Sequence, residues 1–189
     1  MDQFDVLDHG AAQFARVLGT VTPQDWAFPT PCEGWTVQDL VVHVVGGTKM
    51  SVALLDGATS DEAFAILQRD VLGTEPLDTF NEAHAQLSAK FRALDSLEVT
   101  VHHMVGDIPA AMLLGFRIGD LTLHSWDLAR AIGADETLDP VLVQAVWEAV
   151  SPLGDSISET GVFGAGPSGD VPDDAPLQVR LLDLTGRRP

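Results

Sequence analysis

The chain is poor in basic residues and in cysteine. It has ten Lys and Arg against 28 Asp and Glu in 189 residues, which gives a formal net charge of −18. The basic residues form no cluster, so the chain would repel the phosphate backbone of a nucleic acid and an anionic membrane surface. The single cysteine, Cys32, excludes a disulfide within the chain. The composition therefore predicts that neither nucleic acid nor membrane is a partner.

Long apolar runs are also missing, although 46% of the residues are apolar. No run approaches the roughly 20 residues needed to span a bilayer. The first residues, MDQFDVLDHG, are acidic and lack the basic and apolar regions of a secretory signal. Together with the lone cysteine, these features predict a cytoplasmic protein. The length and apolar content predict a globular domain with a sizeable core.

The apolar residues follow the spacing of helices. Nothing in the sequence resembles an alternating βαβ series, a Gly-rich phosphate loop or a GxSxG nucleophile elbow. Apolar seams with steps of three and four residues predict an all-α domain built around a four-helix bundle. The four long helices are expected near residues 4–21, 36–56, 77–94 and 109–132.

Local signals predict several boundaries. Thr36 with Asp39 forms a variant of the capping box, Gly133 is a C-cap, and Asp139-Pro140 opens a further helix. The segment LEVTVHHMVGDIP alternates β-branched residues and contains a Gly-Asp turn, which predicts a small β-hairpin. A shorter helix is expected over 61–72.

The C-terminal part differs in composition. From Gly161 to Ala175 the chain is rich in Gly, Pro and Asp, which predicts a surface loop, and a short terminal element, LQVRLLDLTG, follows it. We therefore expect a helical bundle over residues 1–160, with residues 161–189 packed on it.

The fourth long helix carries a carboxylate and an imidazole one turn apart, at Asp120 and His124. Side chains four residues apart on a helix can reach one ion, and this pair suits Zn²⁺, Ni²⁺, Fe²⁺ or Mn²⁺. The spacing alone is more typical of a simple ion pair between Asp120 and a protonated His124. On a helical wheel the pair belongs to a polar stripe, roughly 80° from the apolar stripe. The polar stripe comprises Arg117, Asp120, His124 and Asp127.

A third ligand would have to come from another helix. His43 lies among valines in the second helix, where a buried imidazole without a partner would cost about 1–3 kcal/mol. Its partner is either a metal or a backbone carbonyl. His84 is the competing candidate, because it lies on the apolar seam of the third helix.

Three further residues have functional or structural interpretations. Cys32 precedes a helix N-terminus, where a thiol pKa is often lowered, but a buried small apolar residue is the favoured interpretation. Asp127 could pair with Arg130, or it could orient a ligand histidine. Trp126 is predicted to lie away from the apolar stripe and to cover a loop or a partner chain.

Two segments, TPCEGWTVQDLVVHVVGG and DLTLHSWDLARAIG, together resemble the N-terminal domain family of mycothiol-dependent maleylpyruvate isomerase. This is a metal-binding family within the DinB-like superfamily. The tail FGAGPSGDVPDDAPLQVRLLDLTGR resembles its actinobacterial members. The resemblance implies a DinB-like four-helix bundle, with short additional helices and a metal at one end.

The resemblance also implies a site and a function. It assigns a divalent metal, Zn or Ni first, to His43, Asp120 and His124, with Asp120 where the isomerase has glutamate. It leaves Cys32 an architectural role in the turn and His84 a packing role. It implies a mycothiol-dependent isomerase or transferase acting on a small electrophile, in which Arg117 binds the cofactor or an acidic substrate. The alternative is a metal- or small-ligand-binding protein without turnover; either is compatible with a homodimer.

Overall fold

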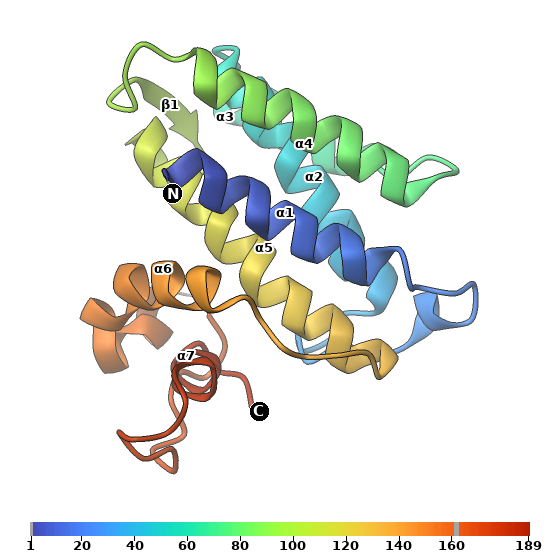
Figure 1. Ribbon diagram of the computed structural model, residues 1–189. Coiled ribbons are helices and arrows are strands. Elements are labelled where there is room, and N and C mark those ends of the chain that lie inside the picture. The colour runs from blue at the N-terminus through green and yellow to red at the C-terminus, as the bar shows by residue number, and fades with distance from the viewer. Residues whose placement is uncertain (1, 161–162) are drawn as a thin grey trace.

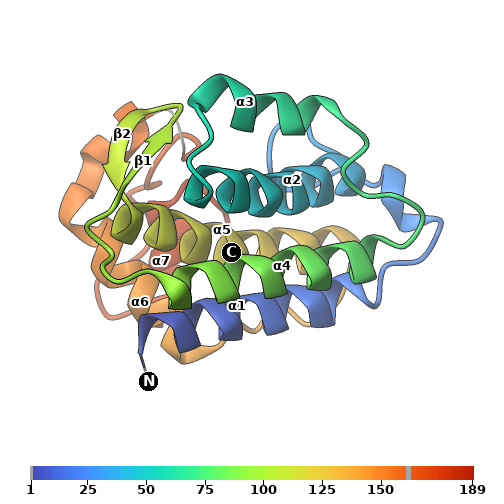
Figure 2. The ribbon, with the colours of Figure 1, turned by 90° about the horizontal axis from the view of Figure 1, so that it is seen from above.

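Four long helices form the body of the protein in the computed structural model, which describes residues 2–160 and 163–189. α1 packs against α4 and α5, and α2 packs against the same two helices, so the four close into a ring (Figures 1 and 2). The predicted all-α class with a small hairpin is confirmed. The four helices are α1 (Gln3–Leu18), α2 (Val37–Leu55), α4 (Pro76–Ala93) and α5 (Ala110–Ile132).

The helix ends follow local chemistry. Thr36 caps α2, since its hydroxyl accepts from the Asp39 amide while the Asp39 carboxylate accepts from the Thr36 amide. Gly133 ends α5 with a φ of 68°, a left-handed conformation that favours glycine. The Asp139 side chain caps α6 (Pro140–Val150). These three predicted boundaries are confirmed.

The hairpin forms, but its turn lies elsewhere than predicted. β1 (Thr100–His103) pairs with β2 (Gly106–Pro109), which makes Met104 and Val105 the turn. The prediction of a Gly-Asp turn is therefore wrong, because Gly106 and its successor already belong to β2. The register pairs Val101 with Ile108, the buried residue of each strand, and burial of one face fixes strand register.

Shorter elements complete the fold. The 3-10 helix η1 (Asp25–Ala27) precedes α2. Two short helices follow α2, namely α3 (Ser60–Phe64) and the 3-10 helix η2 (Ala65–Gln68), where one helix over 61–72 was predicted. After α6 come the 3-10 helix η3 (Ser151–Thr160) and α7 (Leu177–Leu184). The division predicted between 160 and 161 falls beside residues 161–162, which lie outside the described residues. It stays a prediction.

α6 packs beside α5, and α7 packs on α6 and η3 (Figure 1). α6 contacts α1, α5, α7 and η3, and Leu181 and Leu182 of α7 belong to the same hydrophobic core as the long helices. Every residue of α5 from Leu121 to Ala129 is buried. The predicted outward position of Trp126 is therefore wrong; its side chain is 1% exposed. Among the described helices, none is both long and apolar enough for a membrane span.

Candidate metal centre

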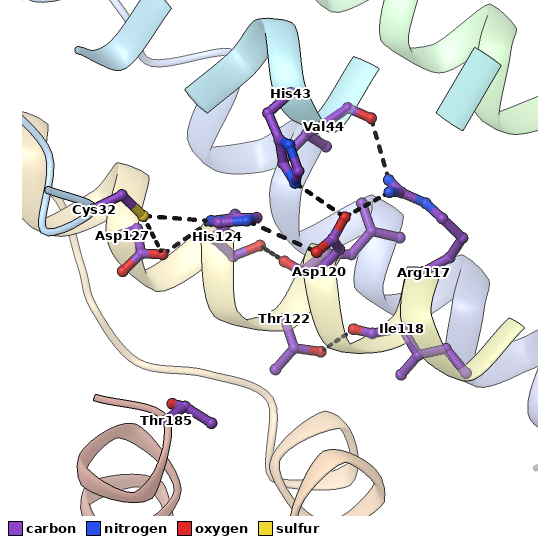
Figure 3. A network of polar contacts seen from close by, with 12 residues as sticks. Cys32, His43, Val44, Arg117, Ile118, Asp120, Thr122, His124, Asp127 and Thr185 are labelled. Atoms are coloured by element: carbon purple, nitrogen blue, oxygen red, sulfur yellow. Dashed lines mark hydrogen bonds and ion pairs between the residues drawn. The ribbon is translucent and has the colours of Figure 1, made fainter. Parts of the chain in front are cut away.

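The packing of α2 on α5 brings His43, Asp120 and His124 together (Figure 3). Nε2 of His43 lies 3.3 Å from Oδ2 of Asp120, and Nε2 of His124 lies 3.8 Å from Oδ1 of the same carboxylate. One ligand atom from each residue can be chosen so that all lie within 4.8 Å of one another. The three candidate ligands named from the sequence thus converge. His84 does not join them, since its Nε2 bonds Asp8 at 2.9 Å between α4 and α1.

The cluster opens toward solvent on the α2 side. The His43 and Asp120 side chains are 39% and 30% exposed, whereas that of His124 is 10% exposed. Trp35 lies beside both imidazoles, with its ring centroid 4.9 Å from that of His43 and 6.0 Å from that of His124. Trp35 is held by its loop, because its amide donates to the Cys32 carbonyl across Gly34, whose φ is 78°. The PCEGW loop therefore forms one wall of the cluster.

Arg117 lies behind Asp120. Its Nη1 donates to Asp120 Oδ2 at 2.6 Å, and its Nη2 donates to the Val44 carbonyl and the Thr48 hydroxyl. Burial alone would raise the pKa of Asp120, but the charge of Arg117 and the hydrogen bond from His43 hold that pKa well below its ordinary value. The carboxylate is thus ionised. The Arg117 side chain is buried, so it is not exposed for the direct contact with a cofactor or substrate suggested by the sequence.

The second ring nitrogen of His124 has a hydrogen-bond partner within the protein. Its Nδ1 lies 2.9 Å from Oδ2 of Asp127, a fully buried carboxylate. Of the two interpretations of Asp127, pairing with Arg130 is wrong, because Arg130 pairs with Glu136 and lies over Trp126. The contact expected of a residue that orients a ligand histidine is present.

Cys32 approaches the same carboxylate. Its Sγ lies 3.4 Å from Asp127 Oδ2 and 3.9 Å from His124 Nδ1. Burial and the negative charge of Asp127 raise the pKa of the thiol to about 12, opposite to the lowering common at helix N-termini. Cys32, His124 and Asp127 thus form a second set with the spacing of metal ligands. Sequence reasoning missed this set, because 92 residues separate the thiol from the imidazole.

Residues 7–129, which contain His43, Asp120 and His124, match the model of the family described as "Mycothiol maleylpyruvate isomerase N-terminal domain". The chain belongs to this family. Two curated relatives are "Uncharacterized protein Rv0738" and "Uncharacterized protein MT0763", from two strains of Mycobacterium tuberculosis. Each is 31% identical over 140 residues, which cover 72% of this chain and 72% of the relative.

Solved structures agree with the family assignment at the level of the fold. The crystal structure of the mycothiol-dependent maleylpyruvate isomerase matches with a TM-score of 0.63 and 19% identity, over 87% of this chain and 72% of that chain. A histidine-to-alanine mutant of the isomerase gives the same values. The predicted family and fold are confirmed, whereas α6, η3 and α7 lie beyond the residues that the family model matches.

Proposed function

We propose that the protein binds a divalent metal ion through His43, Asp120 and His124, and that it uses the ion to activate a low-molecular-weight thiol in an isomerase or S-transferase reaction. The observation that carries the proposal is the convergence of two imidazoles and an ionised carboxylate at a partly open face. Catalytic zinc sites have three protein ligands and one open position. Zn²⁺ and Ni²⁺ both accept such a donor set.

The surroundings of the three residues support the fit. A ligand histidine typically donates its other ring N–H to a carboxylate, and His124 has Asp127 in that place. Arg117 holds the Asp120 carboxylate from the buried side, so both Asp120 oxygens stay near the imidazoles. Arg117 thus acts on the site through Asp120.

The family name and the solved isomerase favour mycothiol as the thiol. A bound metal ion lowers the pKa of a coordinating thiol so that it binds as thiolate. His43 and His124 would hold the ion through ring nitrogens and Asp120 through a carboxylate oxygen, and the Trp35 ring lies beside both imidazoles. A metal held by His43, Asp120 and His124 would in this way supply the nucleophile for a reaction with a small electrophile. The cytoplasmic location and the homodimer stay predictions.

A second candidate function is a metal- or small-ligand-binding protein without turnover. It rests on the same three residues, which would hold an ion whether or not a thiol reacts there. A conjugation assay with mycothiol and simple electrophiles separates the two functions. Metal content without conjugation would favour the binding protein.

Elemental analysis of purified variants tests whether these three residues hold a metal ion. We expect His43→Ala and His124→Ala each to lose most of the bound metal, and Asp120→Asn to weaken binding less. His102→Ala is the matched control, since His102 lies on the exposed hairpin and bonds Asp107. Full metal occupancy in the His43→Ala protein would refute the three-residue site.

A further inference from the structure

The C-terminal tail reaches the metal centre although it lies outside residues 7–129, which match the family model. Arg187 donates from Nε to Asp127 Oδ1 at 2.9 Å and from Nη2 to Oδ2 at 2.6 Å. The same Oδ2 lies 2.9 Å from His124 Nδ1. A polar chain therefore runs from the tail to a ring whose other nitrogen faces Asp120.

The local sequence fixes the position of Arg187. Gly186 follows α7 with a φ of 80°, and a Cβ there would lie 3.0 Å from Gly164 Cα and 3.1 Å from the Ala165 nitrogen. A side chain at this position would meet backbone, which favours glycine. The Arg187 amide then donates to Leu182, and Nη1 donates to the Thr185 carbonyl. The Arg187 side chain is 11% exposed, and the hydrogen bond to the Thr185 carbonyl ties it to its own segment.

The proton on His124 follows from this arrangement. Both oxygens of Asp127 accept hydrogen bonds from the Arg187 guanidinium, so Asp127 meets His124 as a carboxylate acceptor. An ionised carboxylate only accepts hydrogen bonds, and a neutral imidazole has one N–H and one bare nitrogen. With Nδ1 donating to Asp127, Nε2 is the bare nitrogen that can ligate.

The same arrangement separates the two candidate ligand sets. A site made of Cys32, Asp127 and His124 would need the Nδ1 lone pair, which is the opposite tautomer. It would also need an Asp127 oxygen, although Arg187 donates to both of them. The tail thus favours ligation through Nε2.

We propose that Asp127 and Arg187 are positioning residues, which hold His124 in the Nδ1–H tautomer and so make the C-terminal tail part of the metal centre. The consequence for metal binding rests on the proposed function, whereas the tautomer can be measured without metal. Removing a partner of this kind typically weakens metal affinity by about 10–100-fold.

The test compares wild type, Arg187→Ala, Arg187→Lys and Arg188→Ala. Arg188 is the matched control, because it carries the same charge in the same tail but bonds Asp183 and Gly166. Long-range ¹H–¹⁵N NMR of the metal-free proteins at pH 8 reports which nitrogen of His124 carries the proton. Competition with a chelator measures Zn²⁺ affinity.

We expect Nδ1–H in wild type and in Arg188→Ala, and a mixture of tautomers in Arg187→Ala with about 10–100-fold weaker Zn²⁺ binding. Arg187→Lys is expected to restore part of both, since an ammonium can pair with Asp127 without donating from a fork. It also serves as the test variant if Arg187→Ala does not fold.

Two results would overturn the proposal: an Nε2–H tautomer in wild type, or an Arg187→Ala protein that matches Arg188→Ala in tautomer and affinity. A wild type with the Nδ1–H tautomer but no Zn²⁺ affinity would refute the proposed function and leave the assignment of the tautomer standing.

Discussion

Gly47→Ala tests whether the Arg117 guanidinium is held as tightly as the contacts imply. A Cβ added at Gly47 would lie 2.6 Å from Arg117 Nη1, the same nitrogen that donates to Asp120. The guanidinium would have to move, and because Arg117 is 4% exposed it cannot swing into solvent. The new methyl group therefore competes directly with the Arg117–Asp120 hydrogen bond.

The two opposing effects can be estimated. Alanine in a helix interior is about 0.5–1 kcal/mol more favourable than glycine. Loss of a hydrogen bond between charged groups costs about 1.5–3 kcal/mol. The free energy of unfolding should therefore fall by about 1–2 kcal/mol. At roughly 2–4 °C per kcal/mol for a protein of this size, the melting temperature should fall by about 2–8 °C.

Gly115→Ala is the matched control. Gly115 lies in α5, where an added Cβ meets no described atom within 4 Å, so the helix gain of about 0.5–1 kcal/mol should appear unopposed. Urea and thermal unfolding with a chelator present give the two stabilities without any metal contribution. Stabilisation of Gly47→Ala to the same extent as Gly115→Ala would refute the argument. Zn²⁺ affinity should fall only in Gly47→Ala, because Asp120 loses its partner.

Two further predictions concern Asp127 and its neighbours. The Cys32→Ser variant should still bind metal, and its free energy of unfolding should fall by about 1 kcal/mol. The serine hydroxyl can donate to the Asp127 carboxylate, as the thiol does. A folded Cys32→Ser protein without metal would instead assign the ion to Cys32, His124 and Asp127. Burial opposes ionisation of Asp127, but His124 and Arg187 lower its pKa to about 2, below the unfolded value of about 3.9. The stabilisation from ionised Asp127 is therefore present above about pH 4 and is lost toward pH 2. The Asp127→Asn protein should lose less unfolding free energy than wild type between about pH 4 and pH 2. An equal loss in the two proteins would contradict the lowered pKa.

Features that depend on residues a few positions apart could be predicted from the sequence. The Thr36 capping box, the Gly133 cap and the proline that opens α6 each involve chemistry within one helical turn. The Asp120–His124 spacing is of the same kind, because a helix fixes the distance between residues four apart. His43 was a candidate beside His84, and the family resemblance selected it, because no local pattern links either histidine to α5.

Features that depend on packing between distant segments could not be predicted. The helical wheel placed Trp126 outside because it describes one buried stripe, whereas α5 contacts α1, α2 and α6 and is buried on every side from Leu121 to Ala129. Asp127 was matched with the nearest arginine in sequence, but the actual partner, Arg187, lies 60 residues away. Cys32 reaches Asp127 only because the loop before α2 packs against α5.

The use of arginine in this acidic chain supports a site rather than a purely structural cluster. The chain has only ten Lys and Arg, yet the side chains of Arg117 and Arg187 are only 5% and 11% exposed at this one centre, each beside an aspartate that contacts a candidate ligand. A buried ion pair recovers its desolvation cost only with excellent geometry, and well-packed apolar residues of similar volume are often as stable or more so. Stability alone therefore gives little reason to bury two arginines here. Both pairs do constrain the side chains that would hold a metal: Arg117 fixes the carboxylate of Asp120, and Arg187 fixes the ring of His124 through Asp127.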